Sequence, residues 1–105
     1  MAVLSVVTVR VKPGRKADFV AGLKELKEIE NRLGSNLRSM RLFEARVGGS
    51  QPGLMSVVFE YDDLASWGAT VDAEPRDRAF QSLTGPSADD PDELLDQTLY
   101  VEEPL

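Results

Sequence analysis

The sequence contains neither cysteine nor histidine. Without cysteine there is no disulfide bond, no thiolate nucleophile and no thiolate metal site. Without histidine there is no imidazole base, no Ser-His-Asp triad, no histidine-ligated haem and no ordinary zinc site. Acid–base chemistry would therefore depend on a carboxylate, a tyrosine or the substrate itself. We expect no metal and no other cofactor.

Long apolar runs are also missing. No stretch approaches the roughly 20 residues needed to span a bilayer. The longest one near the N-terminus, residues 3–11, is interrupted by Ser5, Thr8 and Arg10 and lacks the features of a signal peptide. We therefore expect a soluble, cytoplasmic protein without a membrane partner. The 105 residues suit one domain that spans residues 1–105.

Positive charge is scarce in the second part of the chain. Residues 1–46 hold ten basic and five acidic side chains, whereas residues 47–105 hold two and thirteen. Such a division can mark a nucleic-acid face. The overall net charge of −6 disfavours a phosphate-backbone partner. We predict instead that the two parts interleave in the fold and offset each other, and we expect no nucleic-acid partner.

The first third of the chain predicts a strand and a helix. β-Branched residues favour a strand over residues 4–12, which Pro13 and Gly14 end. Residues 15–33 are predicted to form an amphipathic helix, with Gly34 placed as its left-handed cap. Its apolar side chains recur three or four positions apart, at Phe19, Leu23, Leu26, Ile29 and Leu33.

The remaining sequence predicts three strands and a second helical region. Strands over residues 37–47 and 54–61 would form a hairpin. A helix opening at Asp62 and Asp63 would end at Pro75. The apolar contacts would be Leu64, Trp67 and Val71, then Phe80 and Leu83 in a short following helix. Residues 84–93 are predicted as a loop and residues 94–102 as the last strand.

The element order β-α-β-β-α-β predicts a ferredoxin-like α+β fold. Right-handed crossovers give an antiparallel sheet with central first and third strands, the last strand beside the first, and both helices on one face. Arg10 and Lys12 would then lie near the acidic last strand. The uncovered face would expose apolar residues, as interfaces do. We therefore predict a homodimer joined through the open sheet faces.

Two segments carry a pattern that is known from one superfamily. The first is Val-Lys-Pro-Gly-Arg at residues 11–15, followed by Phe19 and Leu23. The second is Phe-Glu-Tyr-Asp-Asp-Leu-Ala-Ser-Trp at residues 59–67, followed by Pro75 and Phe80. Both resemble the dimeric α/β-barrel superfamily, especially its NIPSNAP-like and antibiotic-biosynthesis-monooxygenase-like members. The resemblance implies two ferredoxin-like subunits whose sheets form a barrel, and a small-molecule pocket between each sheet and its helices.

The residues of this chain match some activities of the superfamily better than others. Some members oxidise aromatic polyketides without metal or flavin, and others degrade haem. The haem-degrading members use a histidine after the second helix and an asparagine on the first strand. This chain has no histidine and has Ser-Val-Val-Thr at residues 5–8, so haem degradation is disfavoured. Trp67 resembles the tryptophan in the second helix of several monooxygenase-like members.

Four residues are candidates for substrate binding. Trp67, the only tryptophan, would either stack on an aromatic ligand or anchor the second helix to the sheet. Tyr61 would either donate a hydrogen bond to a bound carbonyl or lie at the rim of the sheet. Arg41 shares a strand face with Phe43. If that face meets the helices, Arg41 could bind an anion or enolate, and otherwise the two form a surface pair.

Two acidic groups have ordinary structural interpretations. Asp62 and Asp63 could form a metal or acid–base site, but a helix N-cap is favoured. The second group consists of Asp89, Asp90, Asp92 and Glu93, which resemble ligands for a hard cation. Because this group lacks the glycine and the final glutamate of an EF-hand, we interpret it as a solvated loop. No residue is assigned a catalytic role.

Two functions remain open from the sequence. One is a cofactor-independent oxygenase, or a related enzyme, acting on a small apolar or aromatic molecule. The other is a non-catalytic dimeric binding or accessory module. Buried polar groups converging on an open pocket would favour the enzyme. A pocket filled by side chains would favour the module, and the candidates to fill it are Phe19, Leu23, Phe59 and Trp67.

Overall fold

The computed structural model describes residues 1–34, 36–46, 53–76, 78, 83–84 and 89–105. The elements follow the predicted order, with a short 3₁₀-helix, η1, after the second α-helix. Their bounds are β1 Val3–Val11, α1 Lys16–Arg32, β2 Leu37–Glu44, β3 Leu54–Tyr61, α2 Leu64–Ala73, η1 Glu74–Arg76 and β4 Asp92–Val101. None of the helices in these ranges is long and apolar enough to cross a membrane.

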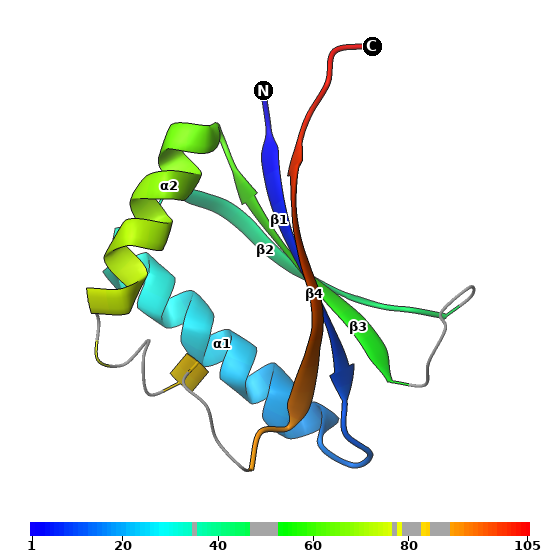
Figure 1. Ribbon diagram of the computed structural model, residues 1–105. Helices are drawn as coiled ribbons and strands as arrows, with labels where there is room; N and C mark the ends of the chain where they lie inside the picture. Colours follow the sequence, from blue (N-terminus) through cyan, green and yellow to red (C-terminus); the bar gives the residue numbers. More distant parts are fainter. Residues whose placement is uncertain (35, 47–52, 77, 79–82, 85–88) are drawn as a thin grey trace.

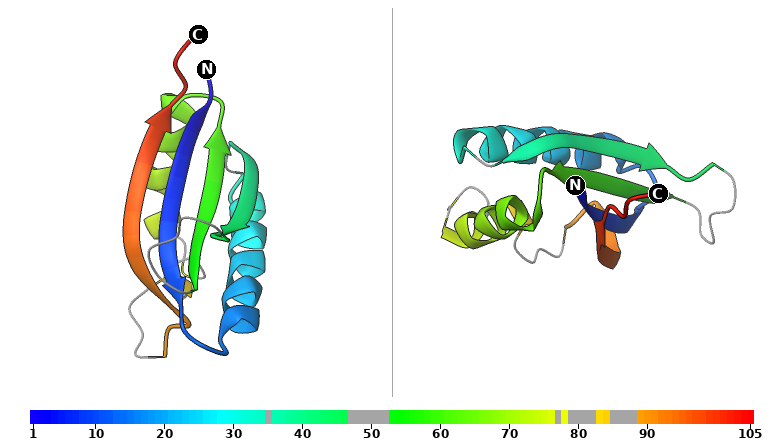
Figure 2. Two further views of the ribbon diagram at one scale, coloured as in Figure 1. Left: turned by 90° about the vertical axis from the view of Figure 1, so that its right-hand side faces the viewer. Right: turned by 90° about the horizontal axis from the view of Figure 1, so that it is seen from above.

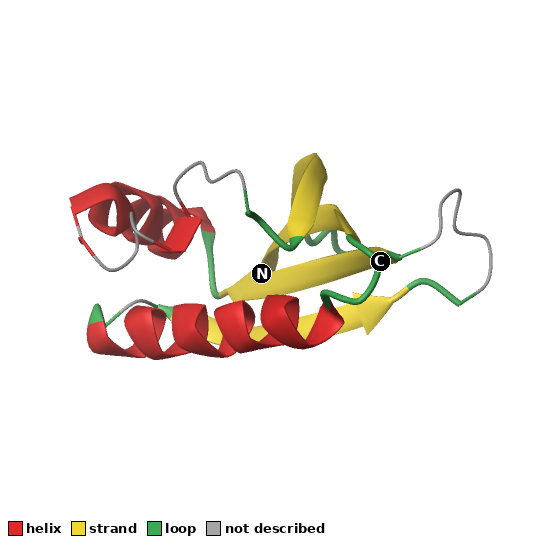
Figure 3. Cartoon of the chain, turned by 90° about the horizontal axis from the view of Figure 1, so that it is seen from below, coloured by secondary structure: helices red, strands yellow, loops and turns green. Residues whose placement is uncertain are grey.

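The four strands form one antiparallel sheet in the order β2-β3-β1-β4. β1 and β3 are central, and both helices lie on one side of the sheet (Figures 1 and 3). Figure 2, left, views the sheet from the other side, with the helices behind it. This arrangement confirms the predicted ferredoxin-like α+β fold.

Pairing between β1 and β4 brings the basic and acidic parts of the chain together. Arg10 lies opposite Glu93 and forms an ion pair with it. The Lys12 amide donates to the Pro91 carbonyl at 2.8 Å. Because both members of the ion pair are about half exposed, it contributes at most about 1 kcal/mol. The pairing confirms the predicted position of the last strand beside the first.

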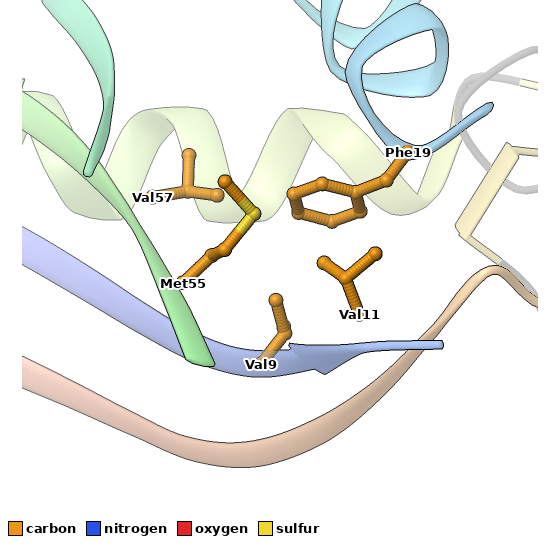
Figure 4. Close-up of a cluster of buried hydrophobic side chains, with 5 residues drawn as sticks. All are labelled: Val9, Val11, Phe19, Met55 and Val57. Carbon is orange, nitrogen blue, oxygen red and sulfur yellow. The ribbon is translucent and has the colours of Figure 1, made fainter. Parts of the chain in front are cut away.

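The main apolar core lies between the sheet and the N-terminal half of α1. Phe19 packs against valines of β1 and against β3, as Figure 4 shows. The buried members of this cluster are Val9, Val11, Phe19, Met55 and Val57. Farther along α1, Ile29 is also buried, so the predicted apolar face is the one that packs. Gly34 has a φ of +66° and ends the helix as expected.

The second helix begins at a side-chain cap. The Asp63 carboxylate accepts the Ser66 amide at 2.8 Å, which confirms the N-cap interpretation of this acidic pair. Its neighbour Asp62 pairs with Arg38 at 3.2 Å. The α-helix ends at Ala73, and Pro75 lies within η1. The predicted position of Phe80 lies outside the described residues.

Two strands differ from their predicted bounds by more than one residue. β2 ends at Glu44, and β4 begins at Asp92, two residues before the predicted start. In β4 the register shifts opposite Thr8 and Val9, so that Leu94 pairs with Val9 while Asp96 pairs with Thr8. Simple alternation along β4 therefore fails at Leu95, because one extra residue there separates the two pairs.

Candidate functional site

A cavity of about 450 Å³ lies between the sheet and the helices. Its floor is the helix-facing side of β1 and β3, and its walls come from α1, α2, residues 83–84 and the start of β4. The apolar residues include Val7, Val57, Phe59, Leu23, Leu26 and Leu83. The aromatic side chains of Phe19 and Phe59 line this space without filling it. A cavity of this size suits a small, largely apolar ligand.

Two of the four predicted site residues line this cavity. Tyr61 ends β3 with its side chain toward the helices and is only 4% exposed. Trp67 lies one turn into α2 and is partly buried. Burial raises the pKa of Tyr61, and the nearby Glu74 and Glu30 raise it further. The Tyr61 hydroxyl therefore stays protonated at neutral pH and can donate a hydrogen bond.

Arg41 and Phe43 lie on the opposite face of the sheet. Their neighbours Met40 and Leu42 pack against the helix-side core, and side chains alternate along a strand. The Arg41 guanidinium lies 5.4 Å from the centre of the Phe43 ring, and Phe43 is 48% exposed. The face of Arg41 and Phe43 therefore does not meet the helices, and the two residues form the surface pair that the sequence left as the alternative. Any ligand contact by this pair stays a prediction for the open face.

Two glutamates that the sequence analysis passes over meet beside Tyr61. Glu30 is only 1% exposed, and its Oε2 atom has no hydrogen-bond partner. Glu74 lines the cavity and is partly buried. Loss of water and contact with the Glu30 carboxyl group, including a hydrogen bond, raise the pKa of Glu74 to about 8. Glu74 can therefore take up or release a proton near neutral pH.

The sequence does contain a signal for this pair. Glu30 lies four residues after Leu26 and three before Leu33, which places it on the apolar stripe of α1. Glu74 lies three residues after Val71 and seven after Trp67, at the start of η1, and it lines the cavity. A carboxylate at such a position is rarely buried without a partner. Neither position reveals that the two carboxyl groups meet, because their contact depends on how the two helices dock.

The other end of the cavity carries further acidic side chains. They are Asp18, at the start of α1, and Asp90 and Asp92, before and at the start of β4. Arg15 offsets part of this charge, because it contacts Asp18 at 2.6 Å and Asp89 at 3.1 Å. In the described part of the chain, no three acidic side chains are grouped as ligands for a metal ion.

No protein-family model and no curated protein matches the sequence. Solved structures do match it, over almost its whole length. A Bordetella bronchiseptica protein, provisionally named as an antibiotic biosynthesis monooxygenase, has a TM-score of 0.66 at 16% identity, and the match covers 97% of both chains. A NIPSNAP family protein of unknown function from Agrobacterium tumefaciens has a TM-score of 0.68 at 16% identity, covering 94% of this chain and 86% of that one.

A third similar structure is a variant of SnoaB, a cofactor-independent oxygenase from Streptomyces nogalater. Its TM-score is 0.69 at 10% identity, and the match covers 99% of this chain and 95% of SnoaB. At such identities the likeness establishes a common fold and leaves activity open. The predicted resemblance to antibiotic-biosynthesis-monooxygenase-like and NIPSNAP-like structures is therefore confirmed at the level of the fold.

Proposed function

We propose that this chain binds a small aromatic molecule in the cavity and acts on it as a cofactor-independent oxygenase. The observation that carries the proposal is a carboxyl group with a pKa of about 8 on the wall of an open, aromatic-lined cavity. A base with a pKa near the working pH is well suited to remove a proton from carbon or from a phenol. The fold that this chain has in common with SnoaB adds support by analogy.

The proposed chemistry assigns a separate role to each side chain. The Glu74 carboxylate takes a proton from an activated CH₂ group that adjoins aromatic rings. Tyr61 donates a hydrogen bond to the substrate oxygen on which negative charge then develops. The carbanion reduces O₂, the CH₂ carbon becomes a carbonyl, and both of its hydrogens leave in water. The balance is R₂CH₂ + O₂ → R₂CO + H₂O, with O₂ as the only oxidant.

Oxygen uptake with anthrone tests this proposal. Anthrone is an aromatic ketone with an acidic CH₂ group, and its expected product is anthraquinone. We expect Glu74→Gln to lower the rate by about a hundredfold, the usual order for loss of a general base. The control Glu28→Gln removes a carboxylate from the exposed side of α1 and should leave the rate unchanged. A wild-type rate equal to that of buffer would contradict oxygenation of such substrates.

Binding without turnover would support the other function, a non-catalytic binding or accessory module. Trp67 reports on this directly, because it is the only tryptophan and lines the cavity. An aromatic ligand stacked on it should change its fluorescence, and Trp67→Phe should weaken binding several-fold. Unchanged affinity and turnover in this variant would show that Trp67 does not serve as an aromatic platform.

We also propose that the chain forms a homodimer through the open face of the sheet. By register, this face carries Leu4, Val6 and Thr8 of β1, Ser56, Val58 and Glu60 of β3, Ser39, Arg41 and Phe43 of β2, and Asp96, Thr98 and Tyr100 of β4. The central residues Val6 and Val58 are apolar neighbours, and Tyr100 is 53% exposed. Apolar side chains gathered on a face without a covering layer support an interface between copies.

A further inference from the structure

The helix-facing side of the two central strands is apolar except for two hydroxyl groups. In β1 this side carries Val3, Ser5, Val7, Val9 and Val11, and in β3 it carries Met55, Val57, Phe59 and Tyr61. Ser5 thus interrupts a row of valines, the residue type that suits a buried strand best. Strand formation and core packing do not explain a serine at this position.

The Ser5 hydroxyl group faces the cavity and lacks a partner within the described part of the chain. Ser5 is only 6% exposed and lines the cavity, and its side chain forms no hydrogen bond with a described residue. Among the described residues, the unpartnered side-chain oxygen that is closed off on all sides is Oε2 of Glu30. The Ser5 oxygen is therefore reached from the cavity. Because a hydroxyl group withdrawn from bulk water needs a hydrogen bond, a molecule in the cavity can supply the partner.

The register of the sheet places Ser5 beside Tyr61. Ser5 lies opposite Phe59, and Tyr61 lies opposite Val3. The two hydroxyl-bearing residues are therefore diagonal neighbours on one face, with backbones about 7 to 8 Å apart. Both hydroxyl groups can donate a hydrogen bond, and that of serine can also accept one. Two such groups on an apolar surface fit a ligand with two oxygen atoms held apart by a ring.

We infer that Ser5 forms a second hydrogen-bonding point for the ligand, and that the ligand is an aromatic molecule with two well-separated oxygen substituents. Tyr61 contacts one of these oxygens and Ser5 contacts the other, so that the pair fixes how the ring lies on the sheet. This inference rests on the proposed binding of a small aromatic molecule in the cavity, and it names the substitution pattern of that molecule.

Three probes with one ring system test the inference by calorimetry. They are 2-naphthol, 2,6-dihydroxynaphthalene and 2,3-dihydroxynaphthalene. The 2,6-isomer has its oxygens at opposite ends of the ring system, whereas the 2,3-isomer has the same two groups side by side. We expect the wild type to bind the 2,6-isomer several-fold more tightly than either of the other probes, because only this isomer reaches both hydroxyl groups.

Ser5→Ala removes the hydroxyl group and leaves the shape of the cavity nearly unchanged. We expect it to weaken binding of the 2,6-isomer about tenfold, because one ligand hydroxyl then loses its partner, and to change the affinity for 2-naphthol less than twofold. The midpoint of thermal unfolding should not fall, since no hydrogen bond within the protein is lost. If Ser5→Ala does not fold, the ranking of the three probes by the wild type still decides.

Ser56→Ala is the matched control from the neighbouring strand. Its hydroxyl group lies on the opposite face of the sheet and contacts that of Thr8 at 3.3 Å. The variant should therefore leave the affinities for all three probes unchanged. Unlike Ser5→Ala, it should lower the midpoint of thermal unfolding, because it removes a hydrogen bond within the protein.

Three results would overturn the inference. They are equal affinities of the wild type for the three probes, equal losses for 2-naphthol and the 2,6-isomer in Ser5→Ala, and a lowered unfolding midpoint in that variant. Each can occur while anthrone is still oxidised, so the inference can fail without the proposed function. If none of the probes binds at millimolar concentration, the proposed binding of small aromatic molecules fails together with the inference.

Discussion

At the scale of single residues, the buried Glu30 is the feature that sequence patterns describe least well. Its position on the apolar stripe of α1 can be read from the spacing of Leu26 and Leu33, but its residue type suggests solvent exposure. For Tyr61 the strand could be predicted, but the surroundings of the side chain could not. Its position at the end of that strand left two roles open. Its burial against the helices settles that it faces the cavity.

Glu74 makes folding stability depend on pH in a predictable direction. Its pKa is about 8 in the folded protein, above the ordinary value of 4.5. Between about pH 5 and pH 8 the folded state thus holds a proton that the unfolded chain has released. The free energy of unfolding should therefore fall as pH rises through this window. The cause is that the charged form of Glu74 is poorly solvated and lies beside Glu30.

Urea unfolding at pH 5, 6.5 and 8 measures this dependence. In Glu74→Gln the titrating group is gone, so the unfolding free energy should vary less over the same range. Asp63 and Glu44 have lowered pKa values, and their contributions are lost only at lower pH, so they do not mask the effect. Parallel pH profiles for the wild type and Glu74→Gln would contradict the assigned environment of Glu74.

At the scale of elements, the cap of α2 is the local interaction best suited to a direct test. Asp63→Ala removes the carboxylate that accepts the Ser66 amide. We expect a loss of about 1 kcal/mol of stability, the typical value for an N-cap. Asp62→Ala is a matched control with the same charge change. It loses only an exposed pair with Arg38 and should cost less. Equal losses in thermal unfolding of the two variants would show that the cap contributes nothing of its own.

The elements themselves could be predicted well, and their side-chain orientations less so. Periodicity places α1 within one residue at each end, and β3 matches its predicted range. The side-chain orientation of β2 could not be predicted, because apolar residues occupy both of its faces. A register shift of one residue would exchange the two faces. Its register with β3 settles that Met40 and Leu42 face the helices. The bulge in β4 had no sequence signal of its own.

At the scale of the whole molecule, element order determines the fold, whereas the candidate site depends on how distant segments meet. The order β-α-β-β-α-β is sufficient for the sheet topology, because crossover handedness leaves few alternatives. The Glu30–Glu74 contact joins α1 to the end of α2, and no local pattern specifies how far apart two helices dock on a sheet. The cavity exists because the side chains between them leave about 450 Å³ unfilled.

The proposed dimer follows from the position of both helices on one face of the sheet, which leaves the other face open. Val6→Glu places a carboxylate at the centre of the open face, opposite Val58 and Thr98. Buried in an interface without a partner, such a charge costs about 3 kcal/mol or more, which is about a hundredfold in the dissociation constant. In a monomer the same side chain remains in water, so the variant should fold normally and sediment as a monomer.

Analytical ultracentrifugation of the wild type, Val6→Glu and Ala21→Glu distinguishes the two states. Ala21 lies on the exposed side of α1, so its variant should remain dimeric with the same added charge. A wild type that sediments as a monomer at micromolar concentrations would contradict the dimer. The cavity would survive that result, because its described lining comes from one chain. The proposed ligand binding and the proposed dimerisation thus depend on opposite faces of one sheet and can be tested separately.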